Sequence, residues 1–293
     1  MKRKKLVTLA SLALALSMML TACSSEKKET KGSSMKDSVS KTESTEETSV
    51  VQPSEVTPIS VSSIQAGDVI TFGAFEQDNN TSNGAEDIEW IVATVEDGRA
   101  LLLSKYVLYS MPYNCAGDVA WEESDVRKWL NEDFYEASFS ENERASIYEV
   151  GLETREPGYS RYLTTKDHVF LLALADLGKY FEMEYWDETY DVGSACYELM
   201  TPATAFAEAN GAWNITMNNK SGKQLVTEHP ELMGVVTCEW WLRETGAFCS
   251  YKGGTIGNYY WEPGDVLTNH YHPCEMEGIG IRPAIWVAVE SGS

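Results

Sequence analysis

Basic side chains are scarce in this sequence: it has 23 Lys and Arg but 45 Asp and Glu, and its formal net charge is −22. Four of the basic residues lie in the first 22 positions and five in residues 24–60, which leaves 14 basic and 38 acidic side chains in residues 61–293. A surface of that sign repels nucleic-acid phosphates and anionic lipid headgroups. The composition therefore excludes DNA and RNA as partners.

The motifs of several enzyme classes are also absent. The sequence has no G-x-S-x-G nucleophile elbow, no H-E-x-x-H or paired C-x-x-C metal motif, and no glycine loop of the phosphate-binding type. A glycosidase needs two positioned carboxylates, and among 38 acids any pair can be chosen, so this signal carries no weight. We predict no cofactor. Ca²⁺ on an acidic cluster stays open, with a solvated surface as the simpler interpretation.

Long apolar runs are missing except at the N-terminus. Residues 2–5 are Lys-Arg-Lys-Lys, residues 6–20 are uncharged and mostly apolar, and Thr21-Ala22-Cys23 follows. This order resembles a bacterial lipoprotein signal, in which cleavage after residue 22 leaves a lipidated Cys23 as the first residue. A transmembrane helix fits less well, because 15 residues span only about 22 Å. We predict a lipid anchor at the extracytoplasmic face of the cell membrane.

The rest of the chain divides into two parts of different composition. Residues 24–60 are mostly Ser, Thr, Glu, Lys and Val without any aromatic residue, so they cannot bury enough apolar area to offset chain entropy. We predict that they form a disordered stalk behind Cys23. Residues 61–293 hold all nine Trp, 15 Tyr and eight Phe, which predicts a single globular domain.

Strands and short helices alternate irregularly in this domain. A first strand is predicted over residues 68–72, ending at Gly73, and an Asp97-Gly98 turn predicts a hairpin between residues 88–94 and 100–104. Short helices are predicted after Ser124, after Ser140 with a capping box to Glu143, over residues 175–181, and from Thr201-Pro202 to Gly211. Further strands are predicted over residues 169–173, 239–243, 247–251 and 279–287. Because no βαβ alternation appears, the predicted fold class is α+β with a mostly antiparallel sheet.

Five cysteines remain once Cys23 is lipidated: Cys115, Cys196, Cys238, Cys249 and Cys274. An odd number without regular spacing indicates no disulfide framework. A bond between Cys238 and Cys249 on neighbouring strands is one option. Free buried thiols that act as small apolar residues fit at least as well.

The best candidate for a binding surface is an aromatic segment with polar neighbours, formed by Tyr260, Trp261, Glu262 and Asn269. Aromatic faces stack on sugars, and amide and carboxylate groups bond to sugar hydroxyls. The alternative is that these aromatics pack into the core.

A possible metal-binding cluster lies nearby. His270, His272 and Cys274 would share one face of an extended strand. Pro273 disturbs that geometry, so a structural or solvated role is favoured and a metal stays undecided.

Several short segments, in order along the chain, resemble a known family: 67–73 (Gly-Asp-Val-Ile-Thr-Phe-Gly), 88–90 (Ile-Glu-Trp), Trp121 with 124–131 (Ser-Asp-Val-Arg-Lys-Trp-Leu-Asn), 167–172 (Asp-His-Val-Phe-Leu-Leu), 240–243 (Trp-Trp-Leu-Arg) and 280–284 (Gly-Ile-Arg-Pro-Ala). They resemble a bacterial domain family of unknown function that is common in surface and secreted proteins of gut Firmicutes. A more distant similarity is to the C-type-lectin-like fold of the formylglycine-generating enzymes. The copper-binding cysteine pair of those enzymes has no evident counterpart here, so the resemblance implies an architecture and no catalytic role.

Within that resemblance, four residues are expected to be structural: Trp240, Trp241, Arg243 and Arg282. A buried guanidinium must be paired, so Arg282 is expected to bridge carbonyls or a carboxylate at the sheet end. The sequence as a whole predicts a membrane-anchored lipoprotein with a non-catalytic binding domain for a glycan, a cell-wall component or a protein. The alternative is an enzyme that acts on an envelope or extracellular substrate.

Overall fold

The computed structural model describes residues 64–155, 162–181, 185–187, 192–193, 199–218, 226–227, 229–244, 248–249, 254–256, 259–261, 266–267 and 273–289. All of them belong to one unit, Ser54–Ser293. For residue 155 and the short pieces 185–187, 192–193, 248–249, 254–256, 259–261 and 266–267, only the backbone is described. Mostly antiparallel sheets, with a parallel pair between β12 (Trp240–Trp241) and β17 (Gly280–Ile281), and a few short helices make up the fold, which confirms the α+β class.

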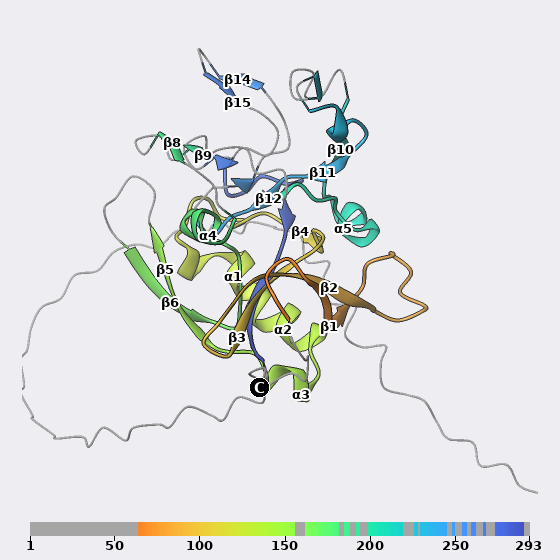
Figure 1. Ribbon diagram of the computed structural model, residues 1–293, viewed down its shortest axis with the longest axis vertical. Coiled ribbons are helices and arrows are strands. Elements are labelled where there is room, and N and C mark those ends of the chain that lie inside the picture. The colour runs from red at the N-terminus through yellow and green to blue at the C-terminus, as the bar shows by residue number, and fades with distance from the viewer. Residues whose placement is uncertain are drawn as a thin grey trace, which may run out of the picture. The chain divides into compact units, whose positions relative to one another are not determined.

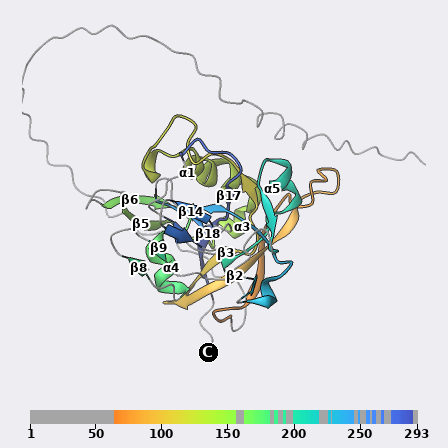
Figure 2. The ribbon, with the colours of Figure 1, turned by 90° about the horizontal axis from the view of Figure 1, so that it is seen from above.

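The first sheet contains five strands, all paired antiparallel, in the order β1-β2-β3-β18-β7. Its strands are β1 (Val69–Phe75), β2 (Glu86–Glu96), β3 (Arg99–Ser104), β18 (Ala284–Ala288) and β7 (Val169–Phe170). The predicted hairpin is confirmed: Asp97 and Gly98 have φ of 50° and 73°, the conformation that a two-residue type I′ turn requires. The C-terminal strand β18, blue in Figure 1, pairs with β3, which belongs to the N-terminal part of the domain. Figure 2 shows the same pair from above.

β1 is longer than the sequence predicted. The strand does not end at Gly73 but continues to Phe75, because a bulge shifts its pairing with β2 between Thr71 and Ala74. Gly73 adopts φ +68° in this bulge, a conformation that glycine accepts without steric cost.

The second sheet contains seven short strands in the order β4-β17-β12-β13-β16-β9-β8. They are β4 (Tyr109–Ser110), β17 (Gly280–Ile281), β12 (Trp240–Trp241), β13 (Phe248–Cys249), β16 (Val266–Leu267), β9 (Val192–Gly193) and β8 (Tyr185–Asp187). The prediction of one strand over residues 279–287 is wrong, because the chain leaves β17 at Arg282-Pro283 and enters the other sheet as β18. Proline has no N–H for a ladder, which suits this crossing point.

Three two-stranded ribbons complete the strands: β5 (Val150–Arg155) with β6 (Tyr162–Asp167), β10 (Asn214–Thr216) with β11 (Val236–Cys238), and β14 (Gly254–Ile256) with β15 (Tyr259–Trp261). The disulfide between Cys238 and Cys249 does not form. Trp240, rather than Cys238, is paired with Cys249, and Cys238 is a free buried thiol. Burial raises the pKa of Cys238 to about 12, so this thiol is unreactive.

The helices are short: η1 (Trp121–Glu123), α1 (Asp125–Trp129), the π-helical η2 (Leu130–Phe134), α2 (Tyr135–Ser138), α3 (Glu141–Arg144), α4 (Leu174–Tyr180), α5 (Ala205–Ala209) and η4 (Pro230–Leu232). Ser124 caps α1 by accepting the Arg127 N–H at 3.1 Å, as predicted. The helix predicted from Thr201-Pro202 begins instead at Ala205, after Thr204. The residues before Thr204 do not join the helix because their backbone pairs with another segment: the Pro202 carbonyl accepts the Val107 N–H at 3.1 Å.

The Trp-Trp-Leu-Arg and Arg-Pro-Ala segments lie in the core. Trp240 and Trp241 are 0% exposed, Arg282 1% and Arg243 2%. Arg282 donates to the Ser104 carbonyl at 2.8 Å and to the Leu199 carbonyl at 3.0 Å. It thereby fixes the crossing between the two sheets. None of the helices in the described part of the chain is long and apolar enough to span a bilayer.

Candidate functional site

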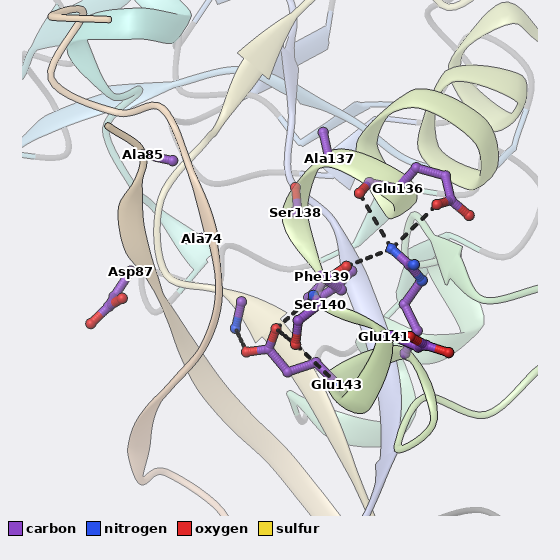
Figure 3. Close-up of a pocket in the computed structure, with 12 residues that line it drawn as sticks. Ala74, Ala85, Asp87, Glu136, Ala137, Ser138, Phe139, Ser140, Glu141 and Glu143 are labelled. Carbon is purple, nitrogen blue, oxygen red and sulfur yellow. Dashed lines mark hydrogen bonds and ion pairs between the residues drawn. The ribbon is translucent and has the colours of Figure 1, made fainter. Parts of the chain in front are cut away.

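A pocket of about 540 Å³ opens between the β1–β2 pair and the turn that joins α2 to α3. Its size is within the usual range of small-ligand sites. The lining consists of Gly73, Ala74, Ala85, Asp87, Glu136, Ala137, Ser138, Phe139, Ser140, Glu141, Glu143 and Arg144. Figure 3 shows Ala74 of β1, Ala85 just before β2 and Asp87 of β2 on one side, and the residues of α2, α3 and the turn between them on the other.

Gly73 lets the two sides approach closely. A Cβ at this position would lie 2.6 Å from the Phe139 ring and 2.7 Å from the Ser138 carbonyl oxygen. Such distances are sterically forbidden, so the bulge in β1 is also the point where strand and helix backbones meet. The close approach of these two sides of the pocket therefore depends on this glycine.

Glu143 joins the two sides through hydrogen bonds. Its Oε1 accepts the Gly73 N–H at 3.0 Å, and its Oε2 accepts the Ser140 N–H at 2.8 Å and the Ser140 hydroxyl at 2.6 Å. Burial raises the pKa of Glu143, but these hydrogen bonds from Ser140 and Gly73 outweigh burial and leave its pKa below the usual value. Glu143 is therefore ionised near neutral pH and acts as a structural acceptor, which confirms the capping box predicted from the sequence.

Arg144 is held by the end of α2. Its Nη1 donates to the Phe139 carbonyl at 2.6 Å and forms an ion pair with Glu136 Oε2 at 3.2 Å (Figure 3). The guanidinium is thus committed to the α2–α3 turn, where it satisfies a carbonyl that the helix leaves unpaired.

Asp87 and Glu141 differ from these residues, because neither side chain has a hydrogen-bond or ion-pair partner among the described residues. The lining as a whole contains four carboxylates, on Asp87, Glu136, Glu141 and Glu143, and one guanidinium, on Arg144. Four negative charges less one positive charge leave a net charge of −3. The pocket therefore favours cations and hydrogen-bond donors.

Ser138 adds an unsatisfied polar group to the wall. The residue is 3% exposed, and its hydroxyl has no hydrogen-bond partner. A buried hydroxyl without a partner is costly. Because the hydroxyl oxygen is itself enclosed by the protein, a ligand in the pocket does not reach it in this conformation.

A separate acidic group lies in the β1–β2 loop, where carboxylate oxygens of Glu76, Asp78 and Glu86 come within 4.8 Å of one another. These oxygens already accept hydrogen bonds from the loop itself: Glu86 from the Gln77 N–H at 2.7 Å, and Asp78 from the Asn80 N–H at 2.7 Å. Burial and the neighbouring carboxylates raise the pKa of Glu76. These hydrogen bonds within the loop are sufficient to explain its conformation. In the part of the chain that the structure describes, these three carboxylates are the group close enough to share a cation such as Ca²⁺.

A buried carboxyl with a strongly shifted pKa lies elsewhere, directly after Arg243. Burial raises the pKa of Glu244 to about 7, partly offset by the Arg243 charge and the Leu174 N–H. Its Oε1 accepts that N–H at 2.9 Å, whereas its Oε2 is enclosed and has no partner.

The binding residues predicted from the sequence are mostly not described. Tyr260 and Trp261 are in β15, where the backbone pairs with Thr255 and Gly254, and their side chains are not described. The remaining predicted positions lie outside the described residues: Cys23, Glu262, Asn269, His270 and His272. Cys274 is described, and it is fully buried.

Sequence reasoning missed the acidic pocket, although it identified the capping box at Ser140. The signal was present in part, since Gly73 was recognised as the end of a strand pattern. What the sequence could not show is that Asp87 and Glu141, from segments about 50 residues apart, line opposite sides of the same pocket.

Comparison with protein-family models finds a match over residues 97–289 to a family described as a domain of unknown function, DUF6273. No curated protein and no solved structure matches the chain.

Proposed function

The chain belongs to the DUF6273 family of domains of unknown function, and from this premise we propose that it is an extracytoplasmic binding lipoprotein. Cys23 carries the lipid anchor, residues 24–60 form the stalk, and the domain binds its ligand without catalysis. The order of charge, apolar run and cysteine in residues 2–23 supports the anchor. The sequence segments that resemble a domain family common in Firmicutes surface proteins also support a role at the cell surface.

The acidic pocket is the observation that carries the binding role. Asp87 on the strand side and Glu141 on the helix side of the lining both present carboxylates without partners among the described residues. The aromatic residue in the lining is Phe139, which is 2% exposed and offers no face for sugar stacking. A cell-wall component or protein segment that carries an ammonium or guanidinium group fits this chemistry better than a neutral sugar does.

Charge in the ligand provides the test. Isothermal titration calorimetry measures the affinity of the mature protein for two oligomers. One is a glucosamine tetramer, which is cationic at mildly acidic pH, and the other is the neutral N-acetylglucosamine tetramer. The cationic oligomer is expected to bind more tightly. Asp87→Asn combined with Glu141→Gln is expected to weaken that binding by roughly two- to thirtyfold, since each exposed ion pair contributes about 0.2–1 kcal/mol.

The matched control is Glu123→Gln combined with Glu208→Gln, which removes two exposed charges elsewhere on the domain. This control separates local recognition from attraction by the overall negative charge. Equal binding of the two oligomers, or an equal loss in both double variants, would reject the pocket as the binding site.

An enzyme acting on an envelope substrate is the alternative, and Glu244 is the observation that favours it. A carboxyl with a pKa of about 7 is suited to general acid–base catalysis. Its unpartnered oxygen is enclosed by the protein, however, so no substrate reaches it in this conformation.

A further inference from the structure

Glu244 links two elements that are far apart in the sequence. It follows the Trp-Trp-Leu-Arg segment, is 6% exposed, and accepts the N–H of Leu174, the first residue of α4, at 2.9 Å. Its second oxygen has no hydrogen-bond partner. An ionised carboxylate in such a position would have one donor where it could use several.

The charges around Glu244 do not balance if it is ionised. The nearest cation, Arg243, pairs with Asp176 Oδ2 at 3.2 Å and uses other N–H groups on Thr154 Oγ1 and the Leu171 carbonyl, both at 2.9 Å. Asp176 is fixed in this role because it also accepts the Ala173 N–H at 2.8 Å. The guanidinium of Arg243 therefore has two carboxyl neighbours, Asp176 and Glu244, and forms its ion pair with Asp176. An ionised Glu244 would have no cation of its own among the described residues.

Tyr113 is the other titratable group that faces Glu244 among the described residues. Its hydroxyl donates to the Arg243 carbonyl at 2.7 Å, and burial raises its pKa well above the usual value. Tyr113 thus stays neutral and supplies no compensating charge.

We propose that Glu244 is a pH-sensitive latch between the segment that follows β12 and the first turn of α4. When the carboxyl is uncharged, the contact is stable within the core. When it ionises, an uncompensated buried charge weakens the contact and favours its opening. This inference does not depend on the proposed ligand or on the pocket.

The direction of the pH effect follows from linkage. Burial raises the pKa of Glu244 from 4.5 to about 7 in the folded protein, so the folded state holds more protons than the unfolded state within that window. The stability contributed by the neutral carboxyl is fully present below pH 4.5 and is lost as the pH rises through about 7. At higher pH the loss is constant.

Urea unfolding of the mature protein and of Glu244→Gln, measured at several pH values, tests the latch. The glutamine keeps the size and the acceptor oxygen but cannot ionise. Relative to this variant, the folding equilibrium constant of the wild type is expected to fall by roughly two to three orders of magnitude across the window. The exposed Glu123→Gln is the control, and its pH profile should parallel that of the wild type. A constant difference between the wild type and Glu244→Gln from acidic to alkaline pH would overturn the proposal.

Two further measurements separate a local latch from a general effect. As the pH rises, hydrogen exchange of the Leu174 amide should become faster in the wild type than in Glu244→Gln. The same difference between the two proteins should be smaller at the Val92 amide, which is hydrogen-bonded in the five-stranded sheet. Asp176→Asn should reduce the pH dependence, because Arg243 then has Glu244 as its remaining carboxyl neighbour. Equal acceleration at both amides, or an unchanged pH dependence in Asp176→Asn, would refute the mechanism.

Discussion

Gly73 provides the sharpest test of how the strand and helix walls of the acidic pocket are joined. In Gly73→Ala two costs act together. The residue keeps φ +68°, which costs about 1–2 kcal/mol for any residue with a Cβ. The new Cβ also meets the Phe139 ring at 2.6 Å and the Ser138 carbonyl at 2.7 Å, and overpacking of this kind typically costs about 1–3 kcal/mol.

The neighbours of Phe139 explain why the clash is not relieved easily. Its ring packs against Phe72 with centroids 5.5 Å apart, Phe134 at 6.0 Å and Trp90 at 6.3 Å, and Ser138 contributes backbone that cannot rotate away. The total expected loss is about 2–5 kcal/mol. For a domain of this size it corresponds to a decrease in melting temperature of roughly 4–20 °C.

Alanine substitutions at two other glycines separate the backbone cost from the steric cost when the melting temperatures are compared by calorimetry. Gly84 has φ +96° with no atom near its virtual Cβ, so Gly84→Ala should show only the backbone cost of about 1–2 kcal/mol. Gly151 has open space and no positive φ, so Gly151→Ala should be close to neutral. If Gly73→Ala melts like Gly84→Ala, the contact with Phe139 is looser than the structure indicates and the reasoning is refuted.

Two predictions concern the core and the anchor. Trp241→Ala removes a fully buried ring and its hydrogen bond to the Met111 carbonyl at 3.1 Å, so it should destabilise the domain by about 3–5 kcal/mol. Trp213, which is 52% exposed, is the control, and an equal loss in Trp213→Ala by urea unfolding would contradict the assignment of Trp241 to the core. Cys23→Ala should abolish lipidation and shift the protein out of the detergent phase in partitioning, whereas unchanged acylation would refute the lipoprotein prediction.

Local signals in the sequence predicted local structure well. The Asp97-Gly98 turn, the Ser124 cap and the Ser140–Glu143 capping box each depend on residues within a few positions of one another. Their hydrogen bonds form wherever the chain is placed, so the side-chain pattern is sufficient to identify them.

Predictions that involved distant partners were less accurate. The pattern over residues 279–287 suggested one strand, yet its two halves pair with β12 and with β3, and the sheet changes at Arg282. The proposed helix at Thr201 was displaced because Val107 forms backbone pairs with residues 202–204. Gly73 looked like the end of a strand, and only the pairing with β2 shows that it is a bulge within one.

The sequence by itself determined the acidic composition, the α+β class and the helix caps, because each depends on composition or short-range spacing. The tertiary structure decided which carboxylates share a pocket and which are buried. Asp87 and Glu141 line the same pocket only because the β1–β2 pair lies opposite the α2–α3 turn. Glu244 acquires its shifted pKa only when α4 and Arg243 remove it from water. The reason is physical: both desolvation and the summed field of neighbouring charges depend on distances in space, which the order of residues along a chain does not specify.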